Sequence, residues 1–252
     1  MSELDNRRPK PRRSRADALR NREQILRAAA DLIVEQGPTT PMEAIARRAK
    51  VGIATLYRHF PDRSVLLRQV AIDTLRQSTE TARSALEEEA DAFTALARFM
   101  HNSIDLKIGA VMPILAARFP SDDELTEARR ECREAHEALI DAAHTEGSLR
   151  PDVTAGDIGL LIVRFTPPLP GPISAEDNDR LSHRHLELML DGLLRFLSHE
   201  VLPGPAMSFE ELIQMRPDLG RGVTNELHAK ERARHSREAT AGNEDTSRTT
   251  GS

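Results

Sequence analysis

The chain has 252 residues, 39% hydrophobic and only 3% aromatic, with a formal net charge of −5 and a single cysteine, Cys132. That one cysteine excludes an intramolecular disulfide, no apolar stretch approaches the ~18 residues of a membrane span, and no secretion signal follows the basic N-terminus, so we expect a cytoplasmic protein. The sequence is rich in Ala, Leu, Arg and Glu and nearly lacks alternating β-branched runs, which predicts an all-α fold.

Basic residues concentrate at the N-terminal end of the chain. Residues 1–70 hold 15 Lys and Arg against 8 Asp and Glu, a net charge of +7, which leaves −12 on the other 182 residues. Residues 1–18 form a basic arm whose segment 7–15 has no apolar residue, so we expect the arm to be disordered. It either lies along phosphates or in a minor groove, or is only a solubilising tail. A basic head on an acidic body indicates nucleic-acid contact at one end.

Two short helices joined by a tight turn are predicted between residues 41 and 60. Thr40 is placed to cap the free amides of the first helix, Pro41 fits its first position, and Glu43 completes a capping box. An apolar stripe follows until Lys50-Val51-Gly52 turns the chain and a second helix opens at Ile53. Helices of about nine and seven residues joined by three have helix-turn-helix spacing, in which the second helix enters the major groove.

The second helix divides into an inward and an outward face. Ile53, Leu56 and Phe60, at i, i+3 and i+7, are expected to point inward. The outward side chains are Ala54, Thr55, Tyr57, Arg58 and His59. They combine small residues that permit close approach with groups that donate to phosphates or read base edges. This face predicts DNA binding.

Four motifs between Leu19 and Val70 resemble the tetracycline-repressor (TetR) family of bacterial transcription regulators. They are the leading helix IL-AAA-LI-EQG, the run T-x-x-x-x-IA-x-x-A-x-V, the recognition helix TLY-x-HF, and the P-D-R-S-x-LL start of the next helix. The rest of the chain is similar only in length and helical pattern. The resemblance implies a helix-turn-helix DNA-binding domain over residues 19–65, followed by a helical ligand-binding and dimerisation domain over residues 66–202.

Motif positions carried over from the family imply a set of DNA contacts. The set consists of Thr40, Thr55, Tyr57, His59 and Arg63, to which Ile53, Ala54 and Arg58 are added as candidates. Gly52 departs from the family, which usually has a serine or similar N-cap there; glycine still caps a helix, but a phosphate-binding hydroxyl is lost. Each contact has a structural alternative. Tyr57 could be a core aromatic, Thr40 and His59 could only cap helix ends, and the arginines could be solvated surface charges.

Six further helices are predicted after the helix-turn-helix. They cover residues 62–89, 92–107, 109–119, 121–144, 155–165 and 175–197. Pro113 is expected to kink or split the third of them. Ser121 and Thr154 are start signals for the fourth and fifth, and Gly147 follows the end of the fourth.

These helices are expected to hold a small-molecule pocket and a homodimer interface. The pocket is predicted among large apolar side chains: Phe93, Phe99, Met100, Met112, Leu115, Phe119 and Phe165. A dimer is expected because one head reads only a few base pairs. The last helix has more apolar side chains than one core-facing stripe needs, which predicts a second buried face between two copies. These side chains are Leu186, Met189, Leu190, Leu193, Leu194 and Leu197. Ordinary core packing is the alternative for both sets.

No metal, cofactor or catalytic site is predicted. His183 and His185 point to different faces of one helix, and His136 and His144 are too far apart for one site. Cys132 is interpreted as a buried small residue or a surface thiol. The sequence shows no paired catalytic carboxylates, nucleophile elbow or Gly-rich phosphate loop, which argues against an enzyme. Residues 203–252 turn polar and mixed in charge, so this tail should be largely disordered.

The sequence therefore predicts a transcription regulator, by family habit a repressor. It would bind double-stranded palindromic operator DNA as a homodimer and be released by a small-molecule effector. A non-specific nucleoid-binding protein is the alternative, because a basic arm and head would serve that role without any effector.

Overall fold

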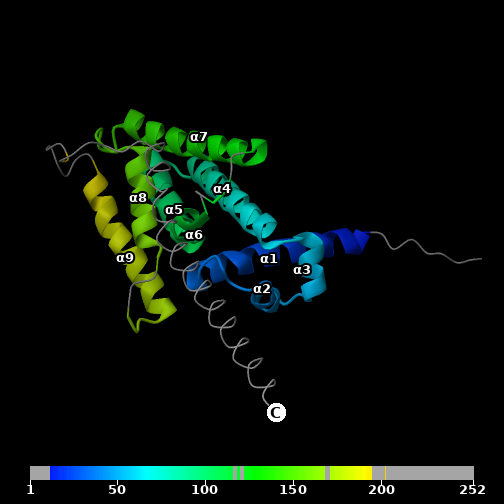
Figure 1. Cartoon of the computed structure of the whole chain (residues 1–252). Coiled ribbons are helices and arrows are strands. Elements are labelled where there is room, and N and C mark those ends of the chain that lie inside the picture. Colours follow the sequence, from blue (N-terminus) through cyan, green and yellow to red (C-terminus); the bar gives the residue numbers. More distant parts are fainter. Residues whose placement is uncertain (1–11, 116–117, 120–121, 168–170, 195–201, 203–252) are drawn as a thin grey trace, which may run out of the picture.

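The computed structural model describes residues 12–115, 118–119, 122–167, 171–194 and 202. Within these ranges the chain folds into nine helices, α1 to α9, and contains no strand, which confirms the all-α expectation (Figure 1). No helix in these ranges is both long enough and apolar enough to cross a membrane. The predictions for residues 1–11, for Leu197 and for the tail 203–252 lie outside the described residues.

The N-terminal head consists of α1 (Arg12–Gln36), α2 (Met42–Arg48), α3 (Ile53–His59) and the first turns of α4 (Arg63–Glu88). These helices share one apolar core. Its fully buried members include Ile25, Ile33, Ile45, Leu56, Phe60 and Leu66. The head is therefore held together by interdigitating aliphatic side chains with one aromatic ring.

The first helix begins earlier than expected. Residues 12–18 belong to α1, whereas the sequence pattern assigned them to a disordered arm. After Pro11 the sequence contains no further proline or glycine before Gly37, and Arg, Ala and Leu are good helix formers. The helix packed in the head can therefore extend outward through exposed residues such as Leu19.

The body consists of α5 (Ala92–Asp105), α6 (Ile108–Leu115), α7 (Asp123–Glu146), α8 (Ala155–Phe165) and α9 (Ala175–Leu193). Local signals set most of these boundaries. Thr154 caps α8, as predicted, and it also forms a capping box with Asp157. The cap of α7 is Asp122, whose carboxylate accepts from the Leu125 amide at 2.9 Å, one residue after the predicted start at Ser121. Gly147 ends α7 in the left-handed conformation, with φ of 73°.

The long helix α4 joins head and body. Its first turns bury Leu66 and Val70 in the head core, and its last turns bury Ala82 and Ala85 in the body core with α5, α7, α8 and α9. Between these, Ile72 packs against the start of α7. One uninterrupted helix is thus part of both cores (Figure 1).

The short helix α6 packs unusually close to α8. It continues through Pro113 to Leu115, so of the two predicted effects, a kink or a split, the split does not occur. A Cβ atom at Gly109 would lie 2.4 Å from the Ile162 carbonyl oxygen and 2.6 Å from Thr166 Oγ1. Only glycine permits this approach, because two backbones nearly touch there.

We predict that Gly109→Ala lowers the free energy of unfolding by about 1–3 kcal/mol, because the added methyl group meets rigid backbone and forces the two helices apart. Urea unfolding followed by circular dichroism measures this change. Gly52→Ala is the control, since the nearest atom to a Cβ there is Thr55 Oγ1 at an ordinary 3.9 Å. Equal stability of the two variants would contradict the close α6–α8 contact.

An ion-pair network ties α4 to the start of α7. Arg68 donates to both carboxylate oxygens of Asp122, at 2.6 and 2.7 Å, and to Glu124 at 3.0 Å. Arg76 reaches the same Glu124 at 3.1 Å. The hydrogen bonds from Arg68, with the Leu125 amide next, lower the pKa of Asp122 to about 2, and Arg68 also lowers the pKa of Glu124.

A carboxylate whose pKa is lower in the folded than in the unfolded state stabilises the fold at pH values above its unfolded pKa. This stabilisation is lost as the pH falls through its folded pKa. We therefore expect the network to weaken between about pH 4 and pH 2. In Arg68→Gln the free energy of unfolding should depend less steeply on pH in this window than in the unchanged protein. Arg83→Gln, an exposed arginine of the same helix outside the network, is the control. Parallel pH profiles for Arg68→Gln and the unchanged protein would refute the network.

Candidate nucleic-acid interface

The turn between α2 and α3 follows the predicted pattern. Ala49 caps the end of α2, Lys50 adopts the left-handed conformation with φ of 56°, and the Val51 amide donates to the Ala46 carbonyl at 3.0 Å. Gly52 is the extended N-cap of α3, which begins at Ile53 as expected. The two helices therefore form a helix-turn-helix.

The inner face of α3 is anchored in the head core. Leu56 and Phe60 are 0% and 1% exposed, which confirms the inward orientation predicted for both. Arg22 of α1 lies over the Phe60 ring, 5.6 Å from its centroid. Ile53 does not follow them: it is 39% exposed, so the prediction that it points inward is wrong. Its position in the first turn places it beside the turn, where no core side chain covers it.

The outer face of α3 is accessible to a partner. Ala54, Tyr57 and Arg58 are exposed, and Thr55 and His59 are half-buried. Tyr57 is 44% exposed, which excludes the core-aromatic alternative. Together with Ile53, this face offers hydroxyl, imidazole and guanidinium donors beside small and apolar groups.

Thr40 has a different structural role from the predicted one. The N-cap of α2 is Pro41, and no side chain makes a capping hydrogen bond there. The capping box predicted for Thr40 and Glu43 is therefore absent. Thr40 is only 4% exposed, and its hydroxyl donates to the Gly37 carbonyl at 2.8 Å. The side chain thus closes the end of α1 instead of opening α2.

Arg63 also points into the head. Its Nη1 atom donates to the main-chain carbonyl oxygens of Thr40 and Pro38, the latter at 3.3 Å. Arg63, the first residue of α4, therefore stabilises the loop between α1 and α2. Thr40 and Arg63 thus both donate to main-chain carbonyls of this loop, and the loop sets the position of α2 relative to α4.

Two exposed cations extend the basic surface around α3. Arg47 and Lys50 lie at the end of α2 and in the turn, and with Arg58 they form no ion pair with any residue that the structure describes. Arg48, by contrast, pairs with Glu35 at 2.6 Å. Neither Arg47 nor Lys50 was among the predicted contacts, although their positions at the end of α2 and in the turn were a usable signal.

The predicted pocket residues are divided among three apolar clusters. Phe99 and Met100 are buried in the body core, with Phe93 and Phe165 packed against it. Leu115 is buried in the head core. Met112 and Phe119 pack against the small cluster between α4 and α7, and Phe119 also packs against the head core. A single pocket among these residues stays a prediction.

The apolar residues predicted on α9 also divide. Leu186, Leu190 and Leu193 are 0%, 4% and 6% exposed and belong to the body core, so they are not a free interface. Met189 is 38% exposed, and its neighbour Leu188, not selected from the sequence, is 62% exposed. Leu194, the C-cap, is half-buried. An apolar face therefore does remain on α9, but it lies around the helix from the leucines expected.

Histidine and cysteine side chains have local partners in the body. His183 of α9 stacks on His101 of α5, with 2.6 Å between their Nδ1 atoms. Cys132 is buried, which raises the pKa of its thiol to about 11. His136 lies beside it in α7, and burial lowers the pKa of that imidazole to about 4. Within the described ranges, no group of three or more His, Cys, Asp or Glu side chains is arranged to hold a metal ion.

Comparison with protein families gives two matches that divide the chain at α4. Residues 25–70 match the model of the bacterial regulatory proteins of the tetR family. Residues 88–195 match the C-terminal domain of SbtR-like transcriptional regulators. A comparison with curated proteins gives no significant match.

Solved structures extend the similarity over both domains. A TetR transcription regulatory protein from Mycobacterium vanbaalenii is 30% identical, with a TM-score of 0.53, over 72% of this chain and 99% of that one. A TetR transcriptional regulator from Streptomyces coelicolor is 27% identical, with a TM-score of 0.51, over 69% and 98%. The regulator AibR, solved with isovaleryl coenzyme A and operator DNA, shares the fold at 18% identity and a TM-score of 0.52, over 69% and 98%. With its helix-turn-helix head and helical body, the chain belongs to the TetR family of transcription regulators.

Proposed function

We propose that the protein is a transcriptional repressor that binds a palindromic operator as a homodimer and leaves it when a small-molecule effector binds. The outer face of α3 carries this proposal. Because Leu56 and Phe60 fix the helix in the head core, the exposed side chains have a defined orientation. A short helix that presents donors at such a surface fits a major groove.

The exposed groups divide into two kinds of contact. Tyr57, His59 and the cations Arg47 and Lys50 are suited to donate to phosphate oxygens, which fix the register of the head. Thr55, Ala54 and Ile53 are suited to contact thymine methyl groups, and Arg58 to bind the acceptors of guanine. Thr40 and Arg63 support the loop behind these residues, so we assign them no direct contact.

A second copy is expected on the exposed face of α9. His185, Leu188, Met189 and Gly192 are exposed and follow the spacing i, i+3, i+4 and i+7, so they lie along one stripe. Two exposed apolar side chains beside a glycine suit close packing of two helices. Dimerisation joins two heads, and their combined affinity for adjacent half-sites exceeds that of either alone.

Binding of an effector is supported at the level of the fold. AibR, which shares this fold, was crystallised in complex with isovaleryl coenzyme A and operator DNA. A protein of this fold can therefore hold a small molecule and DNA at the same time. Coupling the two requires that the effector bind one head-body arrangement more tightly than the other.

Selection from random DNA duplexes tests the proposal as a whole. We expect a palindromic consensus, bound at least ~10³-fold more tightly than random duplex. A non-specific nucleoid-binding protein would instead enrich no sequence and bind all duplexes alike, an outcome that would replace the repressor proposal.

Tyr57→Phe should weaken binding to the selected operator by about tenfold, because a hydrogen bond to a charged phosphate is lost and the ring remains. The slope of log affinity against log salt should stay the same, since no charge is removed. Arg47→Met is the matched variant, and should reduce that slope by about one. Fluorescence anisotropy over a salt series measures both quantities. Unchanged affinity in Tyr57→Phe would remove its hydroxyl from the contacts.

Leu188→Glu should convert the dimer into monomers, because it places a charge in the apolar stripe of α9 without touching the core. Sedimentation velocity at micromolar concentration measures the change. Leu86→Glu, on an exposed leucine of α4, should leave the dimer intact. If Leu188→Glu remains dimeric with the affinity of the unchanged protein, the interface is not on this face.

A further inference from the structure

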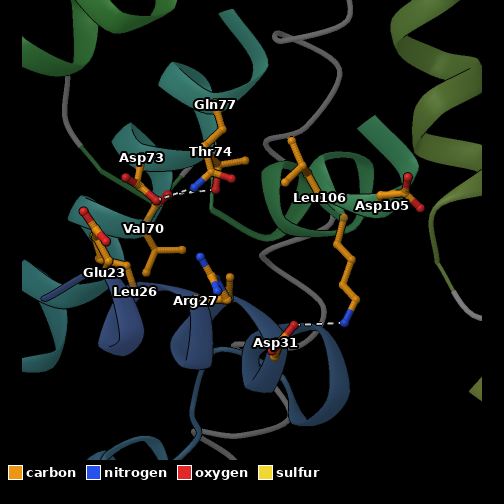
Figure 2. A pocket seen from close by; sticks show the side chains of 12 residues that line it. Glu23, Leu26, Arg27, Asp31, Val70, Asp73, Thr74, Gln77, Asp105 and Leu106 are labelled. Atoms are coloured by element: carbon orange, nitrogen blue, oxygen red, sulfur yellow. Dashed lines mark hydrogen bonds and ion pairs between the residues drawn. The ribbon is translucent and has the colours of Figure 1, made fainter. Parts of the chain in front are cut away.

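A cleft opens between α1 of the head and α4, and the turn between α5 and α6 closes one end of it (Figure 2). Its volume is about 570 Å³, which is large enough for a small organic molecule. None of the seven residues predicted to line a pocket takes part in it. The cleft is lined by the head and by the body at once, and this is the arrangement that a regulatory ligand needs.

The floor of the cleft is apolar. Leu26 of α1 and Val70 of α4 are 2% and 1% exposed, and both belong to the head core. The Thr74 hydroxyl donates a hydrogen bond to the Val70 carbonyl at 2.8 Å, so its hydrogen is already bonded within α4. A ligand lying on this floor would meet hydrocarbon.

The walls of the cleft are negatively charged overall. Four carboxylates, Glu23, Asp31, Asp73 and Asp105, face two cations, Arg27 and Lys107. Lys107 already pairs with Asp31 at 2.9 Å, and Asp105 Oδ1 lies 2.9 Å from His183 Nε2, which leaves Glu23 and Asp73 with one cation, Arg27. Negative charge in a partly buried cleft raises the local concentration of cations.

Asp73 and Glu23 form the most acidic part of the wall. They lie close to each other at one end of the cleft, Asp73 on α4 and Glu23 on α1 (Figure 2). Asp73 Oδ2 accepts from Gln77 at 2.6 Å. Burial, with a contribution from Glu23, raises the pKa of Asp73 against the opposite effect of Gln77, Arg22 and Arg76. A positive group beside Asp73 would offset the cost of burying its charge.

We propose that the cleft binds a small molecule with a primary ammonium group on an apolar body, with the ammonium between Asp73 and Glu23 and the body on Leu26 and Val70. The proposal rests on the proposed function, because it identifies this molecule as the effector class. The ligand would touch α1, α4 and the α5–α6 turn, and the Asp31–Lys107 ion pair already joins α1 to that turn. It would therefore fit one position of the head relative to the body, and binding that position selectively changes operator affinity.

Three probes of equal chain length test the chemistry of the site by isothermal titration calorimetry on the full chain. They are n-octylammonium chloride, 1-octanol and sodium octanoate. Octylammonium should bind at least tenfold more tightly than octanol, because only the former has a charge for the carboxylates. Equal binding of octanol, or tighter binding of octanoate, would overturn the proposal in favour of a merely apolar or an anion-binding cleft.

Two variants test the position of the ammonium. Asp73→Asn should weaken octylammonium binding at least tenfold, and Glu23→Gln, on an exposed side chain that the fold does not need, about threefold or more. Asp179→Asn, on an exposed aspartate of α9, is the matched control and should bind as the unchanged protein does. Ala30→Leu should block the cleft without any change of charge. Full affinity in both Asp73→Asn and Ala30→Leu would place the ligand elsewhere.

Operator affinity, measured with octylammonium chloride and with equimolar sodium chloride, separates this proposal from the function on which it rests. A fall in affinity beyond the salt effect, absent in Asp73→Asn, is the expected result. Binding of octylammonium with no change in operator affinity would refute its regulatory role and leave the DNA-binding proposal standing. Failure to select any operator would refute the repressor proposal, while the calorimetry would still decide whether the cleft binds ammonium ligands.

Discussion

The burial of α4 in two cores is the constraint on which the rest of the structure depends. Its 26 residues form a rod of about 39 Å. Leu66 at one end is fully enclosed by the head, and Ala85 at the other is fully enclosed by the body. With no loop between the two cores, the head cannot swivel freely on a linker. It can only tilt together with the first turns of α4, which limits the positions that α3 can take.

Local signals predicted helix boundaries well wherever the neighbouring residues alone decide them. The Thr154–Asp157 capping box and the start of α3 after Gly52 depend on atoms within a few residues of the boundary. Thr40 carries the same kind of signal but was misassigned, because its hydroxyl donates to the end of α1. Arg63, 23 residues away, holds the same loop through its guanidinium. The bond of Thr40 is as local as the cap that was predicted, so the pattern alone did not distinguish the two, whereas the contact of Arg63 joins distant segments and leaves no signal in the sequence.

Apolar periodicity predicted which side chains are buried, but it did not show whether the chain's own core or a second copy covers them. Leu186 and Leu190 recur at helical spacing because they complete the body core, and the same spacing suggested an interface between copies. Ile53 fits the inward pattern of α3 but lies in its first turn, beyond the reach of the core. The cleft gave no sequence signal at all. Glu23 and Asp73 are 50 positions apart, and only the fold places them on facing helices.

A second helix, α6, connects the two cores and suggests how a change in the body reaches the head. Val111 and Leu115 are fully buried in the head core, while Gly109 in the preceding turn lies against the backbone of α8. Helices packed this closely move together, because there is no free volume between them to absorb a shift of one helix. The left-handed Lys107, with φ of 55°, joins α5 to α6 and pairs with Asp31 of α1. A displacement of this turn would therefore act on α1 through an ion pair and on the head core through α6, without any bend in α4.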